Sequence, residues 1–248
     1  MAGALYDDIG TNYTRFRAED PRLAAAIHAA LGDAATVVNV GAGAGAYEPR
    51  DREVIAIEPS DVMLAQRPPG AARVIQATAE ALPLADDSVD AAMAVLSDHH
   101  WPDRARGLRE MRRVARRRAV VFQFDPAEFT HTWIVRDYLR TFQPLGMSLE
   151  ELAGHLGATR IEPVSIPHDC RDGFFHAYWR RPHAYLDADV RKAISVFQLM
   201  PPAEVDRAMA ALRADLDSGE WQRRNADILD RDDLDLGYRL IVAEYRPR

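Results

Sequence analysis

The sequence predicts an α/β fold, a doubly wound and mostly parallel sheet with a helical insertion before the last strand. Two observations favour this fold class. Short runs of apolar and β-branched residues alternate with helical segments between residues 36 and 124. These runs are nearly continuous in apolar residues, which is typical of parallel strands covered on both faces. With 248 residues, the chain is long enough for one large domain with a substantial core.

The first half of the chain contains the most regular part of this alternation. A helix is expected from Pro21 to Leu31, because Asp20 and Pro21 suit its start and Gly32 its end. The strand at 36–40 enters a glycine cluster, an order that predicts a strand, a tight turn and a helix. The other elements predicted in this half are strands at 54–57, 74–75, 89–96 and 119–124 and helices at 60–66 and 103–117.

Beyond Asp125 the alternation ends. The elements predicted there are a helix at 148–157 with Ser148 and Glu151 at its start, a strand at 160–164 and a last strand at 238–245. The residues at 171–237 are predicted to be mostly helical and are rich in aromatic side chains. We therefore divide the chain into a core, residues 1–170 and 238–248, and an insertion, residues 171–237, which we expect to close over the carboxyl edge of the sheet.

Composition limits the class of partner. The formal net charge of −7 disfavours nucleic acid, whose affinity for proteins comes mainly from cationic contacts with phosphates. Eight arginines lie between residues 104 and 118, but Lys192 is the only lysine, so we interpret this run as a solvated helix face. Cys170 is the only cysteine, which excludes an internal disulfide and a thiolate zinc cluster, and we expect no metal.

The sequence also carries no recognisable membrane or secretion signal. No window approaches the roughly 18 consecutive apolar residues that a membrane span needs. Residues 1–22 lack the apolar segment of a signal peptide. We therefore expect a cytoplasmic protein with a small-molecule partner, and neither nucleic acid nor a membrane as partner.

The glycine cluster after the first strand is the best candidate for a ligand site. Ligands of open α/β sheets bind outside the carboxyl ends of the strands, near the first βα turn. Glycines from Gly41 to Gly45 allow a tight turn and leave no Cβ between main chain and ligand. Gly41, Gly43 and Ala46 satisfy the pattern G-x-G-x-x-G/A, and Glu58 follows at a suitable distance to hold a ribose. The glycines alone do not choose between a nicotinamide cofactor and S-adenosylmethionine.

Five segments together resemble, in order and spacing, class I methyltransferases of the UbiE-like type. They are Val38–Gly45, Ile57–Ser60 with Met63, Ala77–Leu84, Asp86–Asp90 and His99–Trp101. The resemblance covers about residues 37–118 and implies a seven-stranded Rossmann-like sheet. It also implies S-adenosylmethionine as the cofactor and transfer of its methyl group to a small-molecule acceptor.

The resemblance implies a role for each segment. The glycine loop of Gly41, Ala42 and Gly43 would contact the methionine part of the cofactor, and Glu58 would accept from both ribose hydroxyls. The adenine would be bordered by Pro59, Met63, Thr78, Ala79 and Glu80, with Val95 lining the same site. Near the N-terminus, Tyr6, Tyr13 and Arg17 resemble the segment that lies over the cofactor in related enzymes, where an arginine could meet the methionine carboxylate.

Two positions of the expected cofactor site depart from the family pattern. Asn39 stands where an aspartate is more usual, and Thr78 where an aspartate often accepts from the adenine amino group. Both departures favour a weaker cofactor affinity than is typical. A module that binds S-adenosylmethionine without turnover is therefore kept as an alternative.

A nicotinamide-dependent oxidoreductase is the alternative enzyme class. Such an enzyme would usually begin its first strand near the start of the chain, whereas about 36 residues precede Val37. The sequence also has no Tyr-x-x-x-Lys pair, because Lys192 is the only lysine. Both observations favour the methyltransferase.

Catalytic candidates follow the fourth predicted strand. Methyl transfer needs the nucleophile in line with the departing sulfur, and a base helps only when the acceptor must lose a proton. Asp98 and His100 leave the strand near the expected position of the methyl group, and His100 is the candidate base, with packing or capping as the alternative for both. We expect the insertion to be a mobile roof over an apolar acceptor cavity beside them. The alternative is a rigid helical pair that completes the core, or a homodimer interface.

Overall fold

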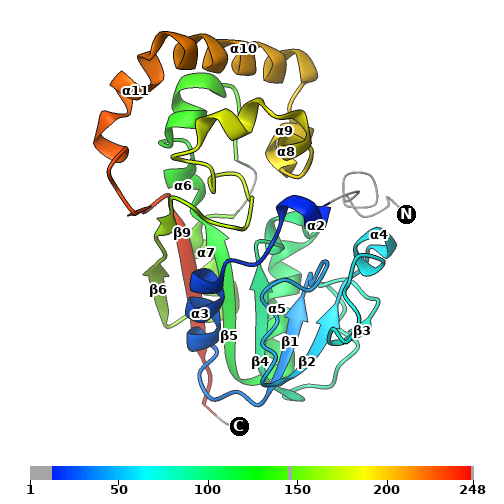
Figure 1. The fold of residues 1–248 in the computed structure, drawn as a ribbon. Helices are drawn as coiled ribbons and strands as arrows, with labels where there is room; N and C mark the ends of the chain where they lie inside the picture. The colour runs from blue at the N-terminus through cyan, green and yellow to red at the C-terminus, as the bar shows by residue number, and fades with distance from the viewer. Residues whose placement is uncertain (1–12, 145–146, 247–248) are drawn as a thin grey trace.

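The computed structural model describes residues 13–144 and 147–246, and its centre is one seven-stranded sheet (Figure 1). The strands, in spatial order, are β3 (Arg73–Ile75), β2 (Glu53–Ile57), β1 (Thr36–Val40), β4 (Val89–Val95), β5 (Ala115–Phe124), β9 (Tyr238–Glu244) and β6 (Arg160–Pro163). The pairs from β3 to β5 are parallel, and β9 runs antiparallel to both of its neighbours. The predicted fold class is confirmed.

Helices cover both faces of the sheet, which explains the continuous apolar strands. In β1, Val37 packs in the cluster that contains residues of α3 (Pro21–Ala30). Val38 and Val40 pack in the opposite cluster, with residues of α5 (Arg104–Val114) and α7 (Leu149–Leu156). Adjacent residues of one strand therefore point to opposite faces and both are buried.

The predicted helix starts are confirmed by their capping contacts. The Asp20 side chain accepts from the Arg22 backbone N–H at the start of α3. Ser148 and Glu151 form a capping box at α7, and Gly157 ends that helix at a φ of 71°.

The helix predicted after the glycine turn is wrong. The twelve residues between β1 and β2 contain neither a helix nor a strand. Gly41, Gly43 and Gly45 all have a positive φ, and so does Tyr47 at 65°. A right-handed helix cannot contain such residues, so the chain stays in a loop until β2 begins.

The arginine run is also only partly helical. The helix predicted to residue 117 ends at Val114, and the next four residues already belong to β5. The last three arginines of the run lie in this strand, and each pairs with a carboxylate. The pairs are Arg116 with Asp90 at 2.9 Å, Arg117 with Asp33 at 2.7 Å and Arg118 with Glu244 at 3.2 Å. The interpretation as one solvated helix face therefore fails for this part of the run.

A helical layer lies at the carboxyl end of the parallel strands, at the top of Figure 1. Its elements are α6 (Pro126–Phe129), the π-helical turn η2 (Ile134–Tyr138), η3 (Pro182–Leu186), α8 (Ala188–Lys192), α9 (Ser195–Leu199), α10 (Pro202–Ser218), α11 (Glu220–Arg224) and η4 (Ala226–Ile228). A small sheet of β7 (Ile166–Pro167) and β8 (Asp233–Leu234) adjoins it. We call this layer the roof. The roof includes α6 and η2, which precede the predicted insertion.

The interior of the roof is aromatic and tightly packed. Trp133 meets Trp221 edge to face at 5.2 Å and Tyr185 at 5.7 Å between ring centroids. Trp179 is also buried, and its Nε1–H donates to the Ile166 carbonyl at 3.0 Å.

Within the described part of the chain, no helix is long and apolar enough to cross a membrane.

Candidate functional site

A pocket of about 350 Å³ opens where β1, β2 and β4 end. It brings together most of the predicted site residues, namely Arg17, Gly41, Ala42, Gly43, Glu58, Pro59, Met63, Thr78, Ala79, Glu80, Val95 and His100. We call it the main pocket. Tyr13 begins α2 (Tyr13–Phe16), but its side chain, like the whole of Tyr6, lies outside the described residues.

The glycine loop of the main pocket requires glycine at two positions, because of its backbone conformation and because a side chain would lack space there. Gly41 and Gly43 have φ values of 70° and 51°, a conformation that side chains disfavour. A Cβ on Gly41 would lie 2.7 Å from the Cβ of Ser97, and one on Gly43 would lie 3.1 Å from Cε of Met63. At Gly41 and Gly43 the loop therefore presents bare backbone to the pocket.

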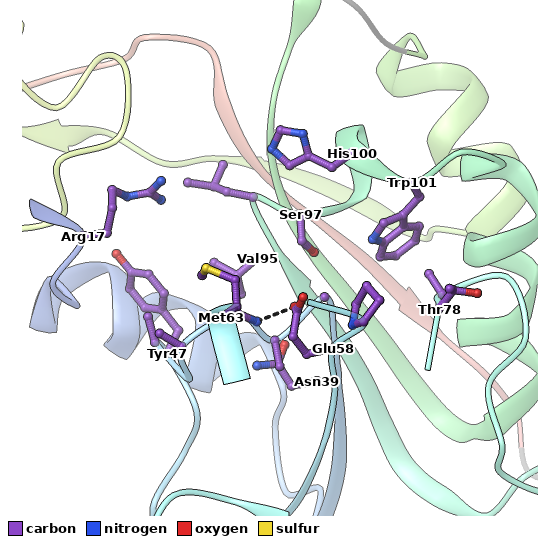
Figure 2. Close-up of a pocket in the computed structure, with 18 of the residues that line it drawn as sticks. Arg17, Asn39, Tyr47, Glu58, Met63, Thr78, Val95, Ser97, His100 and Trp101 are labelled. Carbon is purple, nitrogen blue, oxygen red and sulfur yellow. Dashed lines mark hydrogen bonds between the residues drawn. The ribbon is translucent and has the colours of Figure 1, made fainter. Parts of the chain in front are cut away.

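Glu58 follows β2 directly and connects the two sides of the site. Its Oε2 accepts from the Gly43 backbone N–H at 2.8 Å, the dashed bond in Figure 2, and its Oε1 accepts from the Ser60 N–H at 2.9 Å. Ser60 in turn caps α4 (Asp61–Leu64), which places Met63 beside the loop. Each carboxylate oxygen can accept a further hydrogen bond, so Glu58 can still bind a ligand hydroxyl.

A buried ion pair supports the glycine loop from behind. Arg67 and Glu48 are 5% and 9% exposed and approach to 2.7 Å. Arg67 also donates to the Gly43 carbonyl at 3.2 Å, and Asn39 Nδ2 donates to Glu48 Oε1 at 3.3 Å. The departure at Asn39 thus has a structural partner, because an aspartate there would face the Glu48 carboxylate.

Trp101 forms one wall of the main pocket and was not predicted as a site residue. Figure 2 shows it beside Thr78, on the side of the pocket opposite Arg17 and Tyr47. A Cβ on Gly107 of α5 would lie only 2.4 Å from Cε3 of Trp101, so the glycine lets the indole ring pack there. The signal in the sequence was the aromatic residue directly after the histidine pair.

The two catalytic candidates occupy different environments, although both belong to the turn η1 (Asp98–His100). His100 lines the main pocket. Burial, with a smaller contribution from the nearby Arg17 guanidinium, lowers the pKa of His100 to about 4, so its imidazole is neutral at pH 7. Asp98 does not line the pocket: it is fully buried, paired with Arg104, and accepts from Gln123 Nε2 at 2.5 Å. This arrangement favours a supporting role for Asp98.

A buried carboxylate between β7 and η3 joins the N-terminal segment to the loop between β1 and β2. Asp172 accepts from Arg17 Nε at 2.6 Å and from the Tyr47 hydroxyl at 2.9 Å. The backbone is joined too, since the Gly173 N–H donates to the Phe16 carbonyl at 2.8 Å. The contact predicted between Arg17 and the methionine carboxylate would therefore have to coexist with Asp172.

A smaller pocket of about 80 Å³ adjoins the main pocket and shares Arg17, Leu96 and His100 with it. Aromatic rings dominate its walls, those of Phe124, Phe129, Phe142, Phe174, Phe175 and Tyr238. We call it the aromatic pocket. Its position beside His100 and beneath the roof agrees with the predicted apolar cavity, although Asp98 is not in its lining.

Comparisons with known proteins agree with this geometry. A family model described as a methyltransferase domain matches residues 38–122. A crystal structure of a putative methyltransferase from an antibiotic biosynthesis pathway of Anabaena variabilis is 33% identical, with a TM-score of 0.81, and the match covers 92% of this chain and 98% of that one. The [4+2]-cyclase SpnF is 18% identical with a TM-score of 0.58, over 99% and 95% of the two chains, and shows the fold alone. A search of curated proteins finds no match.

Proposed function

The chain belongs to the methyltransferases with the Rossmann-like class I fold, and from this premise we propose that it transfers the methyl group of S-adenosylmethionine to a small-molecule acceptor. S-adenosylmethionine is the cofactor and supplies a methyl group on a positively charged sulfur. Family membership favours this activity over a nicotinamide-dependent reaction. The UbiE-like motifs further support a place in that subgroup.

The residues of the main pocket fit this cofactor. The glycines of the loop leave room for its methionine part, because no side chain extends from them into the pocket. A Cβ on Gly43 would already crowd Met63. Glu58 offers carboxylate oxygens to the ribose hydroxyls, and the segment of Thr78, Ala79 and Glu80 with Trp101 forms the wall for the adenine.

The protein's own residues would contribute mainly orientation. Transfer requires the acceptor atom about 3–3.5 Å from the methyl carbon and in line with the sulfur. The shared boundary of the two pockets, at Arg17, Leu96 and His100, is where both reactants can meet. The neutral imidazole of His100 can take up a proton that the acceptor releases, although its low pKa makes it a weak base. The roof, which includes the predicted insertion, would exclude water from this point.

The observation that carries the proposal is the contact of Glu58 with the glycine loop at the edge of the main pocket. Calorimetry with S-adenosylmethionine, S-adenosylhomocysteine and NAD⁺ tests it. We expect the first two to bind and NAD⁺ not to bind, whereas the opposite result would refute the proposal.

An acceptor screen by mass spectrometry separates the enzyme from a module that binds without turnover. A methylated product with release of S-adenosylhomocysteine supports the enzyme. Binding without product from any acceptor favours the module. The cyclase with the same fold shows why this second test is needed, because fold alone does not determine the reaction.

A further inference from the structure

We propose that the aromatic pocket is the acceptor site and that it selects a compact, uncharged aromatic acceptor whose reacting atom lies between Arg17 and His100. The inference rests on the proposed methyltransferase function and specifies its substrate class. Its starting point is the boundary that the two pockets share. A molecule held in the aromatic pocket lies next to the cofactor pocket at these shared side chains.

The rings of the aromatic pocket suit an aromatic occupant. Phe129 is central, with centroid distances of 4.8 Å to Phe124 and 5.6 Å to Phe142. Phe174 and Tyr238, which also line the pocket, lie 4.8 Å apart in a tilted arrangement. Such rings prefer tilted or offset partners and add attraction beyond the burial of apolar area. The volume of about 80 Å³ favours a small ring system over a long chain.

The charges around the aromatic pocket disfavour an ionic occupant. Among the described residues its lining contains no carboxylate, so an ammonium group would find no counter-ion among them. Arg17 is already paired with Asp172 at 2.6 Å, which reduces its attraction for an anion. Burial lowers the pKa of both His99 and His100, so neither imidazole carries a charge at pH 7. A charged acceptor would therefore lose its hydration without full compensation.

Leu199 gives the aromatic pocket an apolar mouth. It lines the pocket, yet the residue is 50% exposed. The one other large apolar side chain exposed in the described part of the chain is Ile161, at 42%, on the edge strand β6 and in neither pocket. The two residues form a matched pair, because both tolerate solvent and only one borders the proposed site.

Three probes that share a 4-methylphenyl ring and differ in the charge of its second substituent test the proposal. They are 4-methylphenol, the 4-methylbenzylammonium ion and the 4-methylbenzoate ion, each titrated at pH 7.5 into protein saturated with S-adenosylhomocysteine and followed by ligand-observed NMR. We expect 4-methylphenol to bind at least about tenfold more tightly than either ion. Leu199→Glu should weaken the binding of 4-methylphenol. It should strengthen the binding of the ammonium probe about fivefold, because it places a carboxylate at the mouth of the pocket. Ile161→Glu should change neither.

The outcomes separate this inference from the function on which it rests. Equal affinities for the three probes, no binding of any probe, or equal effects of Leu199→Glu and Ile161→Glu would overturn the acceptor site. Calorimetric binding of S-adenosylhomocysteine in the same samples would then still support the proposed function. Failure of S-adenosylhomocysteine to bind would overturn both.

Discussion

The backbone N–H of Gly43 donates to Glu58 at 2.8 Å, so the glycine loop after β1 is hydrogen-bonded to the residue that follows β2. The same carboxylate accepts from Ser60 at 2.9 Å and faces the main pocket. Glu58 therefore has two tasks, to shape the loop and to accept hydrogen bonds from a ligand. A substitution at this position should affect cofactor binding more than overall stability, because a single charged group serves both tasks within the site.

We expect Glu58→Ala to weaken S-adenosylmethionine binding by about 1 to 3 kcal/mol, the cost of leaving hydrogen-bond partners of a charged group unpaired. Glu58→Gln should also weaken S-adenosylmethionine binding. Its amide N–H₂ would replace one of the two accepting oxygens and would face the backbone N–H of Gly43 or of Ser60. Calorimetry measures both. Glu53→Ala, an exposed carboxylate at the start of β2, is the control. Unchanged affinity in folded Glu58→Ala would remove Glu58 from the site.

Gly43→Val should abolish cofactor binding while most of the fold remains. The backbone at Gly43 has a φ of 51°, and its Cβ would lie 3.1 Å from Met63, so a β-branched side chain adds strain and fills the ligand space. Circular dichroism and calorimetry on one sample report both effects. Gly154→Val is the control, because a Cβ there meets nothing within 4 Å. Normal binding by Gly43→Val would show that the turn is only a loop.

Asn39→Asp should destabilise the protein rather than restore a more typical site. The new carboxylate would lie where Nδ2 now donates to Glu48 at 3.3 Å, in a buried region with one cation, Arg67, for two carboxylates. We expect the free energy of unfolding to fall by about 2 kcal/mol, measured by urea denaturation at pH 7. An unchanged or raised stability would contradict the assigned Asn39–Glu48 contact.

The pKa of His100 predicts a loss of stability in acid. Burial lowers this pKa from 6.5 to about 4 in the folded state, so the unfolded chain binds a proton first as the pH falls. The contribution of neutral His100 is therefore complete above pH 6.5 and is lost as the pH falls towards 4, by up to about 3 kcal/mol. In urea denaturation, His100→Gln should flatten this part of the pH profile. His183→Gln, an exposed histidine, should leave it unchanged, and identical profiles for both variants would contradict the assignment.

How far the sequence could predict the molecule depends on whether the cause is local. The strand Thr36–Val40 has valine at three of its five positions and Ser148 caps α7, so both were predicted. The absence of a helix after Gly41 depends partly on the positive φ of Tyr47, which no local sequence pattern predicts. Asp172 belongs to the site because it accepts hydrogen bonds from Arg17 and Tyr47, which lie more than a hundred residues away in the chain. Such contacts arise only when the roof packs against the sheet.

The roof leads to the last prediction, which concerns where the site opens. The sequence suggested that the whole of residues 171–237 would move, but Trp179 and Trp221 are buried in the roof interior. We therefore expect opening to be confined to the Arg17–Asp172 contact and the adjoining chain. Hydrogen exchange with and without S-adenosylhomocysteine should show added protection at residues 13–17 and 171–175, and none along α10. Asp172→Asn, which weakens the ion pair but keeps its shape, should raise exchange at the same two segments. Equal exchange throughout 171–237 in both states, with no effect of Asp172→Asn, would instead identify the roof as a rigid part of the core.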